Sequence, residues 1–197
     1  HEAYDLGKPF RVGGQTLNTV NVDPRGMKVT LRGTGTKARP KVKAEELQED
    51  GDVIEFETAT TTGEIISFPD DYAGKFVLLH FWSMADQNSL VDLAALKEVY
   101  RRAHSRGFEI ISVSLDTMNQ GQALKDFLKL NEIKWDQIYD NKATESRIAK
   151  SYGIKTTPYS ILVDGETGKI IAMGTATAGI NLQRTLLAAV MKKIQSF

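Results

Sequence analysis

From residue 53 onward, short apolar runs and helical apolar patterns follow one another along the chain. The run 76–82 is interrupted only by His80, which is typical of a strand covered on both faces of a sheet. Further strands are predicted at 53–58, 65–68, 108–115, 159–163 and 169–173, with a short one around Ile138. Apolar residues three or four positions apart predict helices over 90–107, around 124–128, over 143–152 and over 182–194.

The order of these elements indicates the fold class. Strands and helices alternate as far as residue 152, and a two-strand hairpin around 164–168 and a final helix follow. This order predicts an α/β domain with a mixed central sheet and helices on both faces.

Residues 1–50 follow a different pattern. Apolar and polar residues alternate around the sequence Asp23-Pro24-Arg25-Gly26, which suits a type I turn. We therefore predict a β-hairpin over 18–32. The stretch 33–43 is rich in Gly and Thr and then basic, as in a linker. The predicted organisation is an N-terminal extension with hairpin and linker, 1–50, and a main domain, 51–197.

Composition and charge narrow the functional classes. The chain carries 25 basic and 25 acidic side chains, and this net charge of zero gives no indication of nucleic acid as a partner. No apolar run approaches the roughly 20 residues that a membrane-spanning helix needs. The chain begins at His1 rather than Met, and we expect a processed or truncated form that could have lost a targeting segment.

The chain contains no cysteine. This excludes disulfides, thiol catalysis and thiolate metal sites. The three histidines, His1, His80 and His104, lack the spacing of a metal site, so we expect neither a metal nor a cofactor.

Three separated segments resemble one known family. GKFVLLHFW (74–82) resembles the family's GKxVLLNFW, RGFEIISVSLD (106–116) resembles KGFEVVGVSLD, and YGIKTTPYSILVDGETGKI (152–170) resembles YGVxxxPTTFLIDxxGKI. Over about residues 53–195 the chain is therefore similar to the TlpA/ResA-type thiol–disulfide oxidoreductases, a branch of the thioredoxin-like superfamily related to the AhpC/TSA–redoxin group. The resemblance implies a thioredoxin-like fold, here with an N-terminal β-hairpin extension.

The resemblance also locates a degenerate active site. The family turn reads roughly FWxxWCxxC, and here Phe76–Leu90 reads FVLLHFWSMADQNSL. Trp82 matches the second aromatic, but the two cysteine positions fall on Asp86 and Ser89, and the third aromatic is Ala85. Because Asp86 stands at a predicted helix start, we expect its carboxylate to cap the helix, a role without redox chemistry. We therefore assign no catalytic residue.

A second family feature is the loop that precedes the strand at 159–163. The family's cis-proline matches Pro158, preceded by Thr157, and the resemblance implies that this loop lies beside the cysteine positions and can bind an extended peptide. We expect a binding groove lined by Trp82, Ala85, Asp86, Thr157 and Pro158. His80 falls where thioredoxin has a buried acid and is expected to be buried nearby. Asp116 ends a buried strand and is expected to cap the next turn.

Two other chemistries do not fit the sequence. His80, Asp86 and Ser89 suggest a Ser-His-Asp triad. However, His80 should be buried, Ser89 in a first helical turn more often bonds backbone, and the GxSxG elbow is absent. Peroxiredoxin chemistry fails because it needs a cysteine at the same helix start.

The sequence therefore predicts a redox-inactive, thioredoxin-like module that binds a peptide or protein partner. The family resemblance favours an extracytoplasmic location. Two alternatives stay open: an oxidoreductase or antioxidant enzyme whose catalytic cysteines are absent from this chain, and a purely structural domain of a larger assembly.

Overall fold

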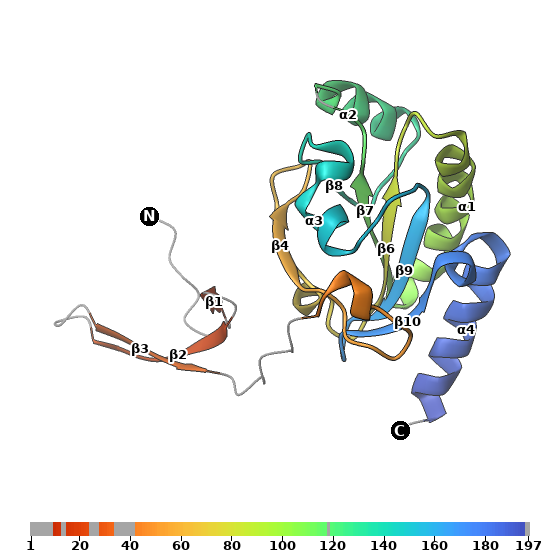
Figure 1. Ribbon diagram of the computed structural model, residues 1–197. Coiled ribbons are helices and arrows are strands. Elements are labelled where there is room, and N and C mark those ends of the chain that lie inside the picture. The colour runs from red at the N-terminus through yellow and green to blue at the C-terminus, as the bar shows by residue number, and fades with distance from the viewer. Residues whose placement is uncertain (1–9, 13–14, 24–27, 34–41, 118, 196–197) are drawn as a thin grey trace. The chain divides into compact units, whose positions relative to one another are not determined.

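The N-terminal part of the chain forms a small antiparallel sheet of its own. The computed structural model describes residues 10–12, 15–23, 28–33, 42–117 and 119–195 (Figure 1), and the chain divides into two compact units, His1–Pro40 and Lys41–Phe197. In the first unit, β2 pairs with both β1 and β3, whose bounds are Phe10–Val12 (β1), Gln15–Asp23 (β2) and Lys28–Gly33 (β3). The β2–β3 pair is the hairpin predicted at 18–32. Residues 24–27 of its expected turn and 34–41 of the expected linker lie outside the described residues.

The second unit is built on a five-stranded mixed sheet with the order β10-β9-β6-β7-β8. The three strands β6, β7 and β8 are parallel, and β9 is antiparallel to both of its neighbours. A separate antiparallel pair, β4–β5, precedes this sheet in the sequence. The bounds are Phe56–Ala59 (β4), Ile65–Phe68 (β5), Phe76–Trp82 (β6), Phe108–Ser114 (β7), Asp136–Ile138 (β8), Tyr159–Asp164 (β9) and Lys169–Met173 (β10).

Among the described residues, four α-helices and five short 3₁₀ helices accompany these strands. The α-helices are Gln87–Ala103 (α1), Gly121–Leu130 (α2), Arg147–Ser151 (α3) and Gly179–Gln195 (α4). The 3₁₀ helices are Ala44–Glu46 (η1), Asp70–Tyr72 (η2), His104–Arg106 (η3), Ala143–Glu145 (η4) and Gly174–Thr177 (η5). None of the helices in the described part of the chain is long and apolar enough to cross a membrane.

The alternation of side chains along β6 creates two hydrophobic cores, one on each face of the sheet. Leu79 and Phe81 pack on one face with residues of α3 and of the β4–β5 pair. Leu78 and Trp82 pack on the other face with residues of α1, α2 and α4. Every residue of β6 is buried, and each large apolar side chain there contributes about 1.5–3 kcal/mol. The mixed sheet with helices on both faces is the predicted thioredoxin-like arrangement. In it, β6 ends at Trp82 and α1 begins at Gln87, shortly after the end of the strand (Figure 1).

The prediction of a single helix over 143–152 is wrong. The structure has η4 and α3 instead, because Ser146 between them has an extended backbone with φ −48° and ψ 133°. The Ser146 carbonyl accepts the first α3 hydrogen bond, from the N–H of Lys150, whereas the Ser146 hydroxyl makes no capping bond. Gly153, with φ +64°, follows the end of α3, as its freedom to adopt a positive φ allows.

Candidate functional site

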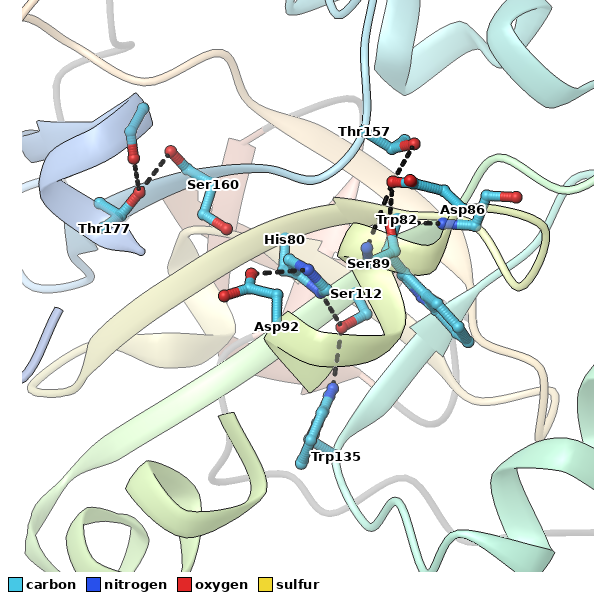
Figure 2. A network of polar contacts seen from close by, with 12 residues as sticks. His80, Trp82, Asp86, Ser89, Asp92, Ser112, Trp135, Thr157, Ser160 and Thr177 are labelled. Atoms are coloured by element: carbon cyan, nitrogen blue, oxygen red, sulfur yellow. Dashed lines mark hydrogen bonds and ion pairs between the residues drawn. The ribbon is translucent and has the colours of Figure 1, made fainter. Parts of the chain in front are cut away.

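The Asp86 carboxylate lies at the start of α1 and caps this helix (Figure 2). Its Oδ1 accepts a hydrogen bond from the backbone N–H of Asn88, and its Oδ2 accepts one from the backbone N–H of Ser89, each at 3.2 Å. These are two of the N–H groups that have no partner within the helix. The predicted role of Asp86 as an N-cap is therefore confirmed.

Two hydroxyl groups also donate to Asp86. The Oγ of Ser89 lies 2.7 Å from Oδ2, and the Oγ1 of Thr157 lies 3.0 Å from the same atom. The Ser89 hydroxyl is the main cause that lowers the pKa of Asp86, and the Thr157 hydroxyl and the two N–H groups act in the same direction, against desolvation. Because a lowered pKa keeps Asp86 ionised at neutral pH, a charged side chain joins the start of α1 to the loop before β9.

A hollow of about 470 Å³ opens beside this junction. It brings together three of the predicted groove residues, Ala85, Asp86 and Thr157. The other residues that line it are Ser83, Leu115, Thr144, Lys155 and Thr156. The Thr157–Pro158 peptide bond is cis, but Pro158 does not line the hollow.

The expectation that Trp82 lines the groove is wrong. Its side chain is 0% exposed, and its ring centroid lies 5.6 Å from that of Phe127 in α2. Its indole N–H donates to Oε1 of Gln137 at 3.2 Å. Trp82 is the last residue of β6, and the alternation of the strand directs it into the core below α1 and α2 instead of toward the hollow.

Asp116 holds the segment that leads into α1, a role that the sequence did not reveal. Its carboxylate is 2% exposed, and Oδ1 accepts from the Oγ of Ser83 at 2.7 Å and from the N–H of Met84 at 2.8 Å. Its Oδ2 accepts from the Oγ of Ser114 at 2.7 Å. Asp116 therefore fixes the β6–α1 connection, whereas we expected it to cap the next turn. The sequence feature that could have indicated this role is an acidic residue at the end of a buried strand.

His80 belongs to a separate buried network below α1 (Figure 2). Its ring is 0% exposed, and Nδ1 lies 3.2 Å from the Oγ of Ser112, which accepts a 2.8 Å hydrogen bond from Nε1 of Trp135. Its Nε2 lies 3.4 Å from Oδ2 of Asp92, within ion-pair distance but without hydrogen-bond alignment. His80 therefore has Ser112 and Asp92 as neighbours, and the Ser89 hydroxyl donates to Asp86 instead.

The described residues include no cluster of three or more histidine or acidic side chains that could hold a metal ion. The chemistry of the site is that of one ionised carboxylate, the ammonium of Lys155, several hydroxyls and backbone groups. An ionised carboxylate accepts hydrogen bonds and attracts cations, but it does not form disulfides.

Comparison with known proteins identifies relatives of the second unit. The model of the AhpC/TSA family matches residues 50–173, which is more than half of the chain. Two proteins named thiol-disulfide oxidoreductase ResA, from Bacillus thuringiensis and Bacillus cereus, are 31% identical to this chain over 101 residues. The matched region is 51% of this chain and 55% of each relative, so the chain spans about half the length of these curated relatives.

Solved structures agree with these matches. The C-terminal domain of a putative thiol-disulfide oxidoreductase from Bacteroides thetaiotaomicron has a TM-score of 0.64 and 26% identity, and the match covers 74% of this chain and 97% of that domain. The thioredoxin domain of a thiol-disulfide oxidoreductase from Bacteroides vulgatus gives 0.63 and 27%, with coverage of 73% and 99%. The chain therefore belongs to the AhpC/TSA family and has the thioredoxin-like fold of its thiol–disulfide oxidoreductase relatives, with Asp86 and Ser89 where the sequence pattern places cysteines.

Proposed function

We propose that this protein is a redox-inactive, thioredoxin-like module that binds an extended peptide or protein segment in the hollow beside Asp86 and Thr157. The observation that carries the proposal is the Asp86 carboxylate itself, at the start of α1 and hydrogen-bonded to Thr157. Thiol–disulfide exchange requires a thiolate that attacks and a sulfur that leaves. The chain has no cysteine, so only the binding half of such a site is left.

The hydrogen-bonding state of Asp86 indicates which groups a ligand would present. Oδ2 already accepts from three donors, two from Ser89 and one from Thr157, whereas Oδ1 accepts only from the N–H of Asn88. Each carboxylate oxygen has about two lone-pair positions, so the three donors at Oδ2 share them, whereas one position is left at Oδ1. A ligand N–H group can therefore bind Oδ1 without displacing an internal bond.

The loop beside Asp86 supplies a backbone surface. Lys155, Thr156 and Thr157 line the hollow and lead directly into β9. Extended peptides bind such segments through main-chain hydrogen bonds, which supply affinity, while pockets for side chains supply specificity. We propose this binding mode for the hollow. Asp86 would then select a peptide that places a hydrogen-bond donor at its free acceptor position.

An insulin-reduction assay with dithiothreitol tests the redox half of the proposal. We expect the full chain to give the buffer rate, and turnover above that rate would contradict redox inactivity.

The binding half is tested by selecting peptides from a display library and titrating them into ¹⁵N-labelled protein. We expect shifts confined to the amides of Ala85–Asp86 and Lys155–Thr157. Ala85→Arg fills the hollow and should abolish binding, whereas Ala94→Arg, at another exposed alanine of the same unit, should not. Binding that survives Ala85→Arg would place the ligand elsewhere.

We also propose an extracytoplasmic location, which rests on the family resemblance alone. Fractionation of the source cells, with immunodetection of the native protein, would test it. Recovery in the cytoplasmic fraction would contradict this part of the proposal.

A further inference from the structure

A second hollow lies between the last turns of α1 and the middle of α4, roughly 20 Å from Asp86 along α1. Its volume is about 250 Å³, below the roughly 300–1,000 Å³ that encloses a drug-sized ligand. Its walls are mainly apolar, and the lining residues are Phe76, Val99, Arg102, Ala103, Arg106, Phe108, Gln183, Leu186, Leu187 and Val190. We call this hollow the α1–α4 groove. Its size suits one or two apolar side chains of a partner.

The apolar surface continues outside the α1–α4 groove. Leu187 is 65% exposed and Met191 is 52% exposed, and the two lie one helical turn apart on α4. Single exposed apolar residues are ordinary, but here two of them adjoin an apolar hollow. Together they form a strip along α4 that a partner could cover.

The charged residues that line the α1–α4 groove are both basic. Its lining contains Arg102 and Arg106 and no acidic residue. Among the α4 side chains that the structure describes, Arg184 is basic and none is acidic. Arg102 is already paired with Glu98, whose Oε1 lies 2.5 Å from Nη2 of Arg102 and also binds Arg101. The surface therefore fits a negatively charged partner.

We propose that the α1–α4 groove binds an acidic amphipathic helix of another protein. Such a helix places side chains at i, i+3, i+4 and i+7 into an apolar groove, and acidic residues beside this row would face Arg102 and Arg106. A second copy of the chain fits poorly, because pairing through α4 would bring like charges together. A lipid surface also fits poorly, since Leu187 and Met191 are the only large apolar side chains of α4 that are exposed among the described residues.

The test uses the full chain and two fluorescein-labelled helical peptides of about five turns. One carries leucine at i, i+3, i+4 and i+7 with glutamate on both flanks, and the other has lysine in place of every glutamate. By fluorescence anisotropy we expect the glutamate peptide to bind at least about tenfold more tightly than the lysine peptide. Leu187→Glu should weaken its binding about tenfold or more, because a buried leucine is lost.

Two further variants make the result specific. Leu130→Glu changes an apolar residue of α2 that is 84% exposed and lies outside the α1–α4 groove, and it should leave affinity unchanged. Arg106→Glu should weaken the glutamate peptide and strengthen the lysine peptide, with circular dichroism confirming that each variant is folded. Equal affinity for the two peptides, or an equal loss with Leu130→Glu, would overturn the proposal. So would binding to phosphatidylglycerol vesicles in place of the peptides, or self-association that Leu187→Glu abolishes.

Discussion

Replacing Asp86 by alanine is expected to destabilise the thioredoxin-like unit by about 1–3 kcal/mol. Loss of a side-chain N-cap costs about 0.5–2 kcal/mol. Loss of a negative charge at a helix N-terminus costs about 0.3–1 kcal/mol more. The Ser89 hydroxyl, in a residue that is 0% exposed, would also lose the oxygen to which it donates. Because such orphaned groups are costly, we expect the upper half of this range.

Asp86→Asn separates the cap from the charge. Asparagine caps helices about as well as aspartate, so this variant should lose only the charge effect, about 0.3–1 kcal/mol. Urea unfolding followed by tryptophan fluorescence measures both variants. The two tryptophans, Trp82 and Trp135, are buried in the same unit and report its unfolding.

The pH dependence gives an independent check. Folding lowers the pKa of Asp86, so its contribution is fully present above the usual aspartate pKa of about 4 and is lost as pH falls through the folded-state pKa. The stability difference between the native chain and Asp86→Asn should therefore shrink below about pH 4. A difference that is constant from neutral to acidic pH would refute the electrostatic argument. A loss below about 0.5 kcal/mol for Asp86→Ala would refute the capping argument.

Three further predictions follow from contacts in the same unit. Asp86→Cys combined with Ser89→Cys places two thiols at the spacing of the family pattern, and the first stands at a helix start that lowers its pKa. This variant should reduce insulin above the buffer rate, and a folded but inactive variant would contradict the prediction. Ser112→Ala leaves a buried indole N–H and an imidazole nitrogen without a partner, and urea unfolding should show a loss of about 2 kcal/mol or more. Asp116→Asn weakens the anchor of the β6–α1 connection, and hydrogen exchange at the Met84 amide should accelerate by about tenfold or more.

The central strands could be predicted closely from the sequence, because both are continuous apolar runs with clear ends. The predicted 76–82 equals β6, and 108–115 exceeds β7 by one residue. The region 143–152 was mispredicted because its helical pattern runs through Ser146, whose backbone preference divides it. The break lies in the backbone of Ser146, whose side chain makes no capping hydrogen bond, and a pattern that counts only apolar residues does not detect such a break.

The site was predictable only where local chemistry decides it. Asp86 caps α1 because of its position before a helix, and the sequence shows that position. The hydrogen bonds of Asp116 to the β6–α1 segment and the approach of Asp92 to His80 depend on how distant segments meet, which no local pattern encodes. The position of Trp82 at the end of an apolar strand indicates that its side chain is buried. The prediction that Trp82 lines the groove rests instead on the family's aromatic position.

The sequence pattern that the chain resembles has a cysteine at the position of Asp86, and the carboxylate found there has a consequence for binding as well as for redox chemistry. The helix start that would lower a cysteine pKa holds a carboxylate here, and a thiolate loses its charge on oxidation whereas this carboxylate has no redox couple. The Thr157 hydroxyl can therefore stay bound to Asp86 whatever the redox conditions. This bond holds the start of α1 and the loop before β9 together on two sides of the hollow. A hollow held in place before binding needs less ordering when a ligand enters, so we infer that Asp86 favours binding by preorganising the site.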